Sequence, residues 1–171
     1  MIAEHKPREH QDKPVIQDPH CFVHCASYPS LQWAQHQNGV FRTSNAGEHW
    51  ERFEDIDSST FGFAVAVYPT DGSTTWLVPS ESDEVRFPID GRIVVTRTRN
   101  RGKSWKRLEN GLPQQDAYDL VFRQAFNVDD SGNCISFGLK TGWLRISGNQ
   151  GDAWTTASQN LLPVYCVIFA E

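Results

Sequence analysis

An eight-residue pattern occurs three times in this 171-residue chain and limits its fold more than any other feature. Each copy (a box, below) has Ser or Thr first, Asn third, Gly fifth and Trp eighth. The glycines lie about 50 residues apart, a period typical of propellers and solenoids. The shared residues are Thr43, Asn45, Gly47 and Trp50, then Thr98, Asn100, Gly102 and Trp105, then Ser147, Asn149, Gly151 and Trp154.

The residue types in a box predict a tight turn. An Asn side chain accepts hydrogen bonds from nearby backbone N–H groups, which fixes the turn. The Gly permits positive φ, and the Trp packs the turn onto its own sheet. We therefore expect each box to be a structural turn.

The segments around the boxes repeat as well. Residues 22–29 and 64–69 are extended runs that end in Tyr-Pro, and a Trp-containing run follows each of them. In the third unit, residues 120–123 are expected to be the corresponding first strand. Each unit thus reads as four short antiparallel strands, A to D, with the box at the C–D turn, which is the pattern of a propeller blade.

The predicted fold is all-β, a partial β-propeller of three blades plus the first strand of a fourth. The blades span about residues 18–59, 60–115 and 116–162, and residues 163–171 form the extra strand. Residues 1–17 are polar and Pro-punctuated, so they are expected to be a flexible lead-in. Three blades cannot close a ring alone, so we expect self-association or a partner chain to complete it.

The boxes resemble the Asp-box, or BNR, repeat of sialidase-like β-propellers, Ser/Thr-x-Asp-x-Gly-x-Thr/Ser-Trp, with Asn replacing Asp in all three copies. The run QDPHCFVHC…WAQHQNGVFRTSNAGEHW is similar to bacterial glycosyl-hydrolase-like BNR-repeat proteins, often labelled exo-α-sialidase. The resemblance implies the C-terminal portion of such a propeller. It also implies that any site lies on the face opposite the boxes.

Composition narrows the range of partners. The net charge is −5, and no basic stripe marks a nucleic-acid surface. No run approaches the roughly 20 apolar residues of a membrane helix. The polar N-terminus and four cysteines without CxxC spacing indicate a reduced cytoplasmic protein. Neither a metal nor another cofactor is expected.

Blade geometry locates a candidate site. In a propeller the D–A and B–C connections share one face (the near face), and the boxes lie on the opposite one (the far face). The longest near-face loop, residues 79–91, carries Glu81, Asp83, Glu84 and Arg86. Asp83 and Glu84 are candidate catalytic carboxylates and Glu81 and Arg86 candidate ligand contacts, as in glycan sites with paired carboxylates. The alternative is a solvated loop in which Arg86 makes a local ion pair.

A second cluster comprises Asp18, His20, His36 and Asn38, expected to bind a polar ligand through hydrogen bonds. His20 and His36 fall at the same end of antiparallel strands, so a two-His–one-carboxylate metal site is geometrically allowed. His24 cannot join His20 on one ion, because four residues of a strand span about 13 Å. Polar residues lining the propeller channel are the preferred interpretation.

Tyr118 and Asp119 form the third candidate. A Tyr beside a carboxylate is similar to the tyrosine nucleophile of sialidases, so Tyr118 is a catalytic candidate and Asp119 a ligand-binding one. The alternative is a half-buried Tyr at a strand start. The leading functional hypothesis is a propeller that binds a polar ligand, such as a glycan, on its near face, with hydrolysis as an open question. The competing hypotheses are a non-catalytic protein-interaction propeller and an incomplete fragment.

Overall fold

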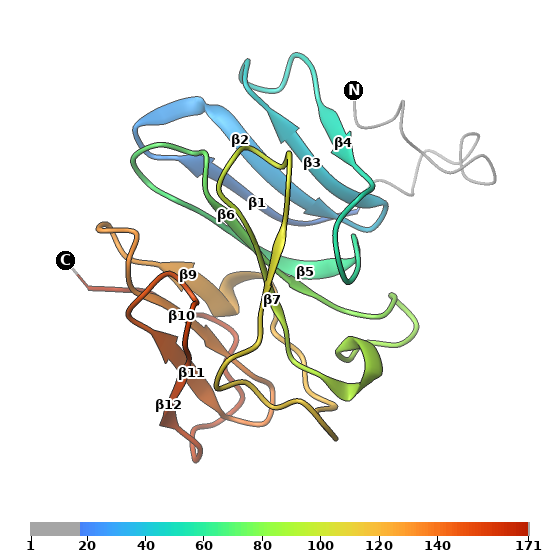
Figure 1. The fold of residues 1–171 in the computed structure, drawn as a ribbon, viewed down its shortest axis with the longest axis vertical. Helices are drawn as coiled ribbons and strands as arrows, with labels where there is room; N and C mark the ends of the chain where they lie inside the picture. The colour runs from blue at the N-terminus through green and yellow to red at the C-terminus, as the bar shows by residue number, and fades with distance from the viewer. Residues whose placement is uncertain (1–17, 171) are drawn as a thin grey trace.

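The computed structural model describes residues 18–170, which form three four-stranded antiparallel sheets (Figure 1). In each sheet the strands are neighbours in chain order, so each sheet is a meander of the kind that builds a propeller blade. The predicted all-β partial propeller is thereby confirmed. Blade one contains β1 (Pro19–Cys25), β2 (Tyr28–His36), β3 (Gly39–Thr43) and β4 (Glu51–Phe53); blade two contains β5 (Gly62–Val67), β6 (Thr75–Pro79), β7 (Val95–Thr98) and β8 (Lys106–Leu108); blade three contains β9 (Phe126–Val128), β10 (Ile135–Gly138), β11 (Leu144–Ser147) and β12 (Thr155–Ser158).

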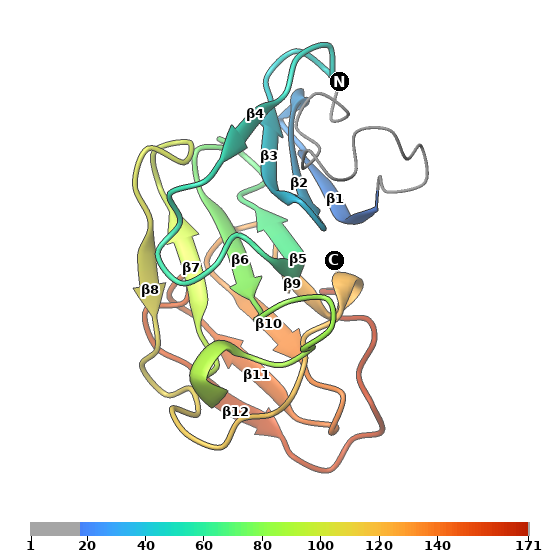
Figure 2. The same ribbon diagram turned by 90° about the vertical axis from the view of Figure 1, so that its right-hand side faces the viewer.

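The first strand of each blade lies on the inside of the partial ring. β5 lies next to both β1 and β9, and the later strands follow outward in order (Figures 1 and 2). Two short 3-10 turns, η3 (Ile89–Gly91) and η4 (Arg123–Ala125), sit in the connections of the near face. Within residues 18–170 no helix has the length and apolar character needed to cross a membrane.

Side chains from facing sheets fill the spaces between blades. Trp33 of blade one packs with Val65 and Leu77 of blade two. Trp76 and Val95 on the other side of blade two pack with Phe137 of blade three. All six side chains are buried, and those of blade two are covered by a neighbouring blade on each face of its sheet.

The third blade begins later than the sequence predicts. Residues 120–123 were expected as its first strand, but β9 starts at Phe126 and η4 precedes it. Leu120 and Val121 are nevertheless buried, and Val121 belongs to the core between blades two and three. An apolar run can satisfy its burial from a connection, so its hydrophobicity alone does not identify a strand.

Residues 163–170, expected as the first strand of a fourth blade, belong to none of the strands. They run alongside blade three, where the Val164 N–H donates to the Leu139 carbonyl and the Val167 N–H to the Gln124 carbonyl. A Cβ added at Gly138 would lie 2.1 Å from Val164 Cγ1, so the segment packs closely on β10. Contact with η4 and β9 places it beside the inner strand of blade three. The expected lead-in, residues 1–17, lies outside the described residues.

Each box closes its turn with the same hydrogen bonds. In the second box, Asn100 Oδ1 accepts from the Ser104 N–H at 2.9 Å and from Thr98 Oγ1 at 3.0 Å. Thr98 Oγ1 in turn accepts from the Gly102 N–H at 2.9 Å. The first and third boxes have equivalent bonds. The amide oxygen thus serves as the acceptor that the sequence predicts.

The boxes also join neighbouring blades. The Gln150 carbonyl in the third box accepts from Arg97 Nη1 at 2.7 Å and from Trp76 Nε1 at 2.9 Å, both in blade two. Arg97 is buried, and its Nη2 pairs with Asp152 Oδ1 at 3.0 Å. One blade earlier, Arg42 donates in the same way to the Arg101 carbonyl of the second box. Arg42 and Arg97 each directly precede a box, so the contact is a repeating feature.

Two replacements of a box Asn distinguish the loss of its acceptor oxygen from the addition of a charge. We expect Asn149→Ala to lower the free energy of unfolding by about 1–2 kcal/mol, because the Ala153 N–H and Ser147 hydroxyl lose their acceptor. Asn149→Asp retains the oxygen and should change stability by less than about 0.5 kcal/mol. Urea unfolding measures both, with Asn160→Ala on the exposed segment as the matched control. Equal losses for Ala and Asp would contradict the acceptor role.

Candidate functional site

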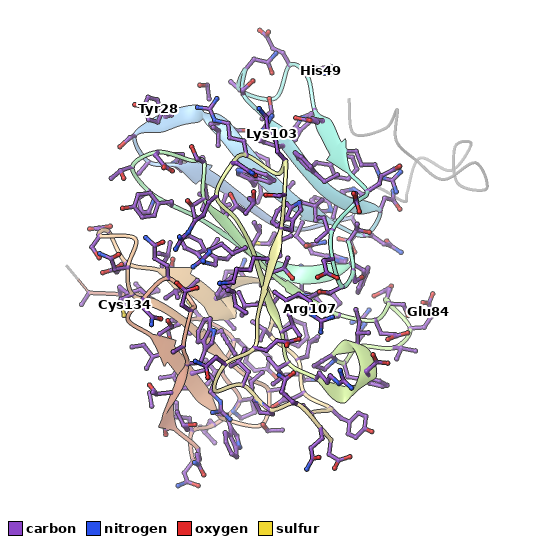
Figure 3. All side chains as sticks on the ribbon, viewed as in Figure 1. Tyr28, His49, Glu84, Lys103, Arg107 and Cys134 are labelled. Atoms are coloured by element: carbon purple, nitrogen blue, oxygen red, sulfur yellow. The ribbon has the colours of Figure 1, made fainter. Side chains whose placement is uncertain are left out.

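The strand order places the connections on two opposite faces. Tyr28 begins β2 directly after the first A–B turn, and His49 and Lys103 lie in boxes, so all three are on the far face. Glu84 lies in the B–C loop of blade two on the near face. Figure 3 shows Glu84 on the right-hand side of the molecule, away from Tyr28 and His49 at the top and Cys134 on the left. The candidate residues of loop 79–91 therefore lie away from the boxes.

The loop of residues 79–91 is closed by its own contacts. Arg86 Nη2 pairs with Asp83 Oδ1 at 2.6 Å, and Arg86 Nε donates to the Asp83 carbonyl at 2.8 Å. The Arg86 guanidinium also lies 5.6 Å from the centre of the Phe63 ring. Glu81 and Glu84 are exposed on the same loop. This geometry corresponds to the local ion pair of the alternative interpretation.

Three of the residues in the second cluster lie close together. His20 is buried, its Nδ1 lies 2.6 Å from the Gly62 carbonyl, and its ring stacks on Phe63 at 4.5 Å. His20 Nε2 lies 3.8 Å from Asp18 Oδ2. His36 follows at the end of β2, where it pairs in register with Pro19. The predicted grouping of Asp18, His20 and His36 is thus present in the fold.

His36 is held as a neutral imidazole. The side chain is buried, and its Nδ1 accepts a hydrogen bond from the Asn38 N–H at 3.0 Å. Burial, together with a smaller effect of repulsion from His20, lowers the pKa of His36 to about 4. Within residues 18–170, no group of three or more His, Cys, Asp or Glu side chains is arranged to hold a metal ion. Through the His20–Gly62 hydrogen bond and the pairing of His36 with Pro19, the cluster connects strands β1, β2 and β5.

The third candidate lines a pocket at the boundary between blades two and three. The pocket has a volume of about 380 Å³. Tyr118 lies on it, is 66% exposed, and meets the Phe87 ring edge-on at 5.4 Å. Asp119 Oδ2 accepts from the Thr141 N–H and hydroxyl, which ties the two connections together. The predicted Tyr118 and Asp119 thus line this pocket, and loop 79–91 contacts Tyr118 through Phe87.

Sequence reasoning missed the other polar and aromatic side chains of this pocket. Trp143 directly precedes β11, Arg145 is the second residue of that strand, and Asp116 comes from the connection that precedes Tyr118. The Arg145 guanidinium lies 4.7 Å from the centre of the Trp143 ring. Both follow the B–C segment 140–142 that the blade geometry assigns to the near face. The signal that could have found them is an Arg two residues before the third box.

A second pocket of about 260 Å³ lies at the equivalent boundary between blades one and two. Asp57 and Ser58 come from the connection after blade one, and Asp90, Arg92 and Arg107 come from blade two. Each blade boundary thus has a near-face hollow next to a D–A connection. The two hollows differ in their linings, since this one has no aromatic side chain.

The comparisons identify the fold. No protein-family model matches the sequence, and no curated protein does. Among solved structures, YCF48 from Cyanidioschyzon merolae matches with a TM-score of 0.58 at 17% identity, over 86% of this chain and 39% of its own. YCF48 bound to D1 peptide matches with a TM-score of 0.55 at 14% identity, over 88% and 44%. A GH74 xyloglucanase from Xanthomonas campestris matches with a TM-score of 0.62 at 19% identity, over 81% and 20%.

These similarities define a class, the β-propellers. The chain spans about two fifths of the YCF48 chains and about one fifth of the xyloglucanase. At such identities the likeness concerns the fold alone, and the sialidase-like assignment has no counterpart among these structures.

The neutral state of His36 predicts a pH-dependent stability. Its pKa is about 4 in the folded protein and about 6.5 in an unfolded chain, so the unfolded chain takes up the proton first as pH falls. Stability should be complete above about pH 6.5 and should decline by about 2–3 kcal/mol on going to pH 4. Urea unfolding across this window checks the decline. His36→Gln should flatten the curve, and His24→Gln at an exposed position should leave it unchanged. A His36→Gln curve as steep as that of the parent protein would contradict this assignment.

Proposed function

We propose that this protein is a binding propeller that recognises a polar ligand, such as a glycan, on its near face. The observation that carries the proposal is the pocket between blades two and three, which combines two aromatic side chains with charged and hydroxyl groups. Ligand sites typically combine a mostly apolar lining with a few placed polar groups. Tyr118, Trp143, Thr141 and Arg145 supply that combination here.

The aromatic side chains are suited to a ring-shaped polar ligand. Tyr118 is largely exposed at the edge of the pocket, and Trp143 is partly exposed beneath Arg145. Aromatic faces contact the C–H surface of a sugar ring while hydroxyl and charged groups bind its edge. Thr141 lies beside Tyr118 because Asp119 holds its hydroxyl and N–H.

Binding without hydrolysis accounts better for the carboxylates. A glycosidase acid and base would lie about 5–9.5 Å apart across the ligand. The Asp83 carboxylate instead pairs with Arg86, and Glu84 is exposed on the same loop. Asp119 accepts three hydrogen bonds from its own connection and from Thr141. The proposal therefore assigns Glu81, Arg86, Asp119 and Tyr118 to ligand contact or support and none of them to bond cleavage.

Protein recognition is the second candidate function. Four of the large exposed apolar side chains, Leu161, Leu162, Tyr165 and Ile168, lie within the segment after blade three. A concentration of this kind marks a protein-contact surface. One of the similar structures is YCF48 bound to a D1 peptide, so the propeller fold also serves peptide binding. Self-association through this segment belongs to the same hypothesis.

A matched pair of tyrosines tests the near-face pocket. Tyr118 on the near face is 66% exposed, and Tyr28 on the far face is 57% exposed. We expect an oligosaccharide array to yield ligands whose affinity, measured by calorimetry, falls about tenfold in Tyr118→Ala, because the stacking surface is lost. Tyr28→Ala should bind as the parent protein does.

Two other results of this experiment would contradict a ligand site in the near-face pocket. Binding that survives Tyr118→Ala but not Tyr28→Ala would place the site on the far face. An array without ligands, together with concentration-dependent dimers that Leu162→Asp disrupts, would favour the protein-interaction hypothesis.

A further inference from the structure

Arg145 is a buried cation without a counter-ion. It is 7% exposed and lines the pocket between blades two and three. Its Nη1 donates to Thr156 Oγ1, and its Nε has no hydrogen-bond partner among the described residues. No carboxylate of residues 18–170 forms an ion pair with it. Burial lowers its pKa, and no neighbouring acid opposes that effect.

Burial of an unpaired charge is costly, so the arrangement needs an explanation. Removal of a cation from water costs several kcal/mol unless an anion or several hydrogen bonds compensate. Arg97 shows the compensated case in the same protein, since it pairs with Asp152 and donates to the Gln150 carbonyl. Within the part of the chain that the structure describes, Arg145 instead contacts the Thr156 hydroxyl and the face of Trp143.

Blade packing does not require an Arg at this position. The residue two places before each box is Phe41 in blade one, Thr96 in blade two and Arg145 in blade three. All three are buried, and Thr96 occupies its position without any charge. The sheet therefore tolerates an apolar or a small neutral side chain there. The guanidinium is a particular property of the boundary between blades two and three.

We propose that Arg145 binds the oxyanion group, carboxylate or phosphate, of a ligand that enters this pocket. The inference rests on the proposed near-face function and adds the charge of the ligand. A guanidinium binds such groups through paired N–H donors, and a stacked aromatic ring holds its plane in place. The apolar lining from Ile93, Leu139 and Trp143 would receive the body to which the anion is attached.

The two acidic residues that line this pocket form no ion pair with Arg145 in the described part of the chain. Asp119 uses Oδ1 for the Leu120 N–H and Oδ2 for Thr141. Asp116 is exposed at the edge of the pocket and has a φ of 51°, which is set by the turn into blade three. Among residues 18–170, Arg145 is the cation that lines this pocket.

The test observes Arg145 directly, with Arg97 as the internal control. Nε–H signals of the intact chain, labelled with ¹⁵N, are followed by NMR during titration with sodium acetate, benzoate or inorganic phosphate, with ionic strength held constant by chloride. We expect a saturable shift at Arg145 and none at Arg97, and benzoate should bind about tenfold more tightly than acetate because its ring fills the apolar lining. Benzamide, which has the same shape without the charge, should leave Arg145 unshifted.

Two variants separate charge from fold. Arg145→Thr reproduces the residue of blade two and should retain a cooperative unfolding transition while losing the stabilisation that benzoate gives the parent protein. Arg145→Lys retains the charge without the paired donors and should weaken benzoate binding about tenfold. An Arg145 signal that ignores all three anions, or that shifts no more than Arg97, would overturn the proposal.

The outcomes also distinguish the two levels of inference. If the Arg145 signal does not shift with any anion but the protein still binds a neutral oligosaccharide through Tyr118, the anion proposal is wrong and the proposed near-face site still stands. A response to phosphate alone would assign a phosphorylated ligand, and a response to benzoate and acetate alone a carboxylated one.

Discussion

The contact between one blade and the box of the next supports the whole partial ring. Arg97 and Trp76 of blade two both donate to the Gln150 carbonyl, and Arg97 also pairs with Asp152. These bonds are made on the far face, where the Arg precedes its own box and reaches the following one. A charged donor that is buried and fully used contributes more than a surface ion pair. Because this Arg directly precedes the Thr that ends the C strand and begins the box, the turn and the contact between blades belong to one local motif.

Because these contacts between blades lie on the far face, the loops of the near face can vary in sequence without disturbing them. The connections there are held by short-range bonds, such as those of Asp83 with Arg86 and of Asp119 with Thr141. Two near-face hollows result, one at each blade boundary. Loops on a rigid scaffold are where binding residues commonly lie. The difference between the two linings is therefore more informative about function than the boxes, which repeat almost unchanged.

Much of the architecture could be predicted from the sequence because its determinants are local. The box residues Thr98, Asn100 and Gly102 bond within one turn, so their order in the chain is sufficient to identify it. The start of blade three could not be predicted, because Leu120 and Val121 obtain their burial from a connection. The register that pairs Pro19 with His36 brings Asp18, His20 and His36 to one end of the sheet, which strand order allows one to expect, and their role in ligand binding stays a prediction. The sequence shows Arg145 two residues before the third box, but the lack of an ion-pair partner for it among residues 18–170 becomes apparent only in the fold.

Blade three differs from the other two in a way that links its two faces. Where blade two has Trp76 opposite Arg97, blade three has Ser136 opposite Ile146, so it cannot donate to a following box as blade two does. Its Arg lies one residue earlier, at Arg145, and adjacent residues of a strand point to opposite faces of the sheet. The cation therefore turns back toward blade two and the near-face pocket. When the Arg moves one position earlier in the strand, it no longer donates to the next blade and becomes a buried charge beside the near-face pocket. Local departures of this kind from a repeat are expected at functional sites.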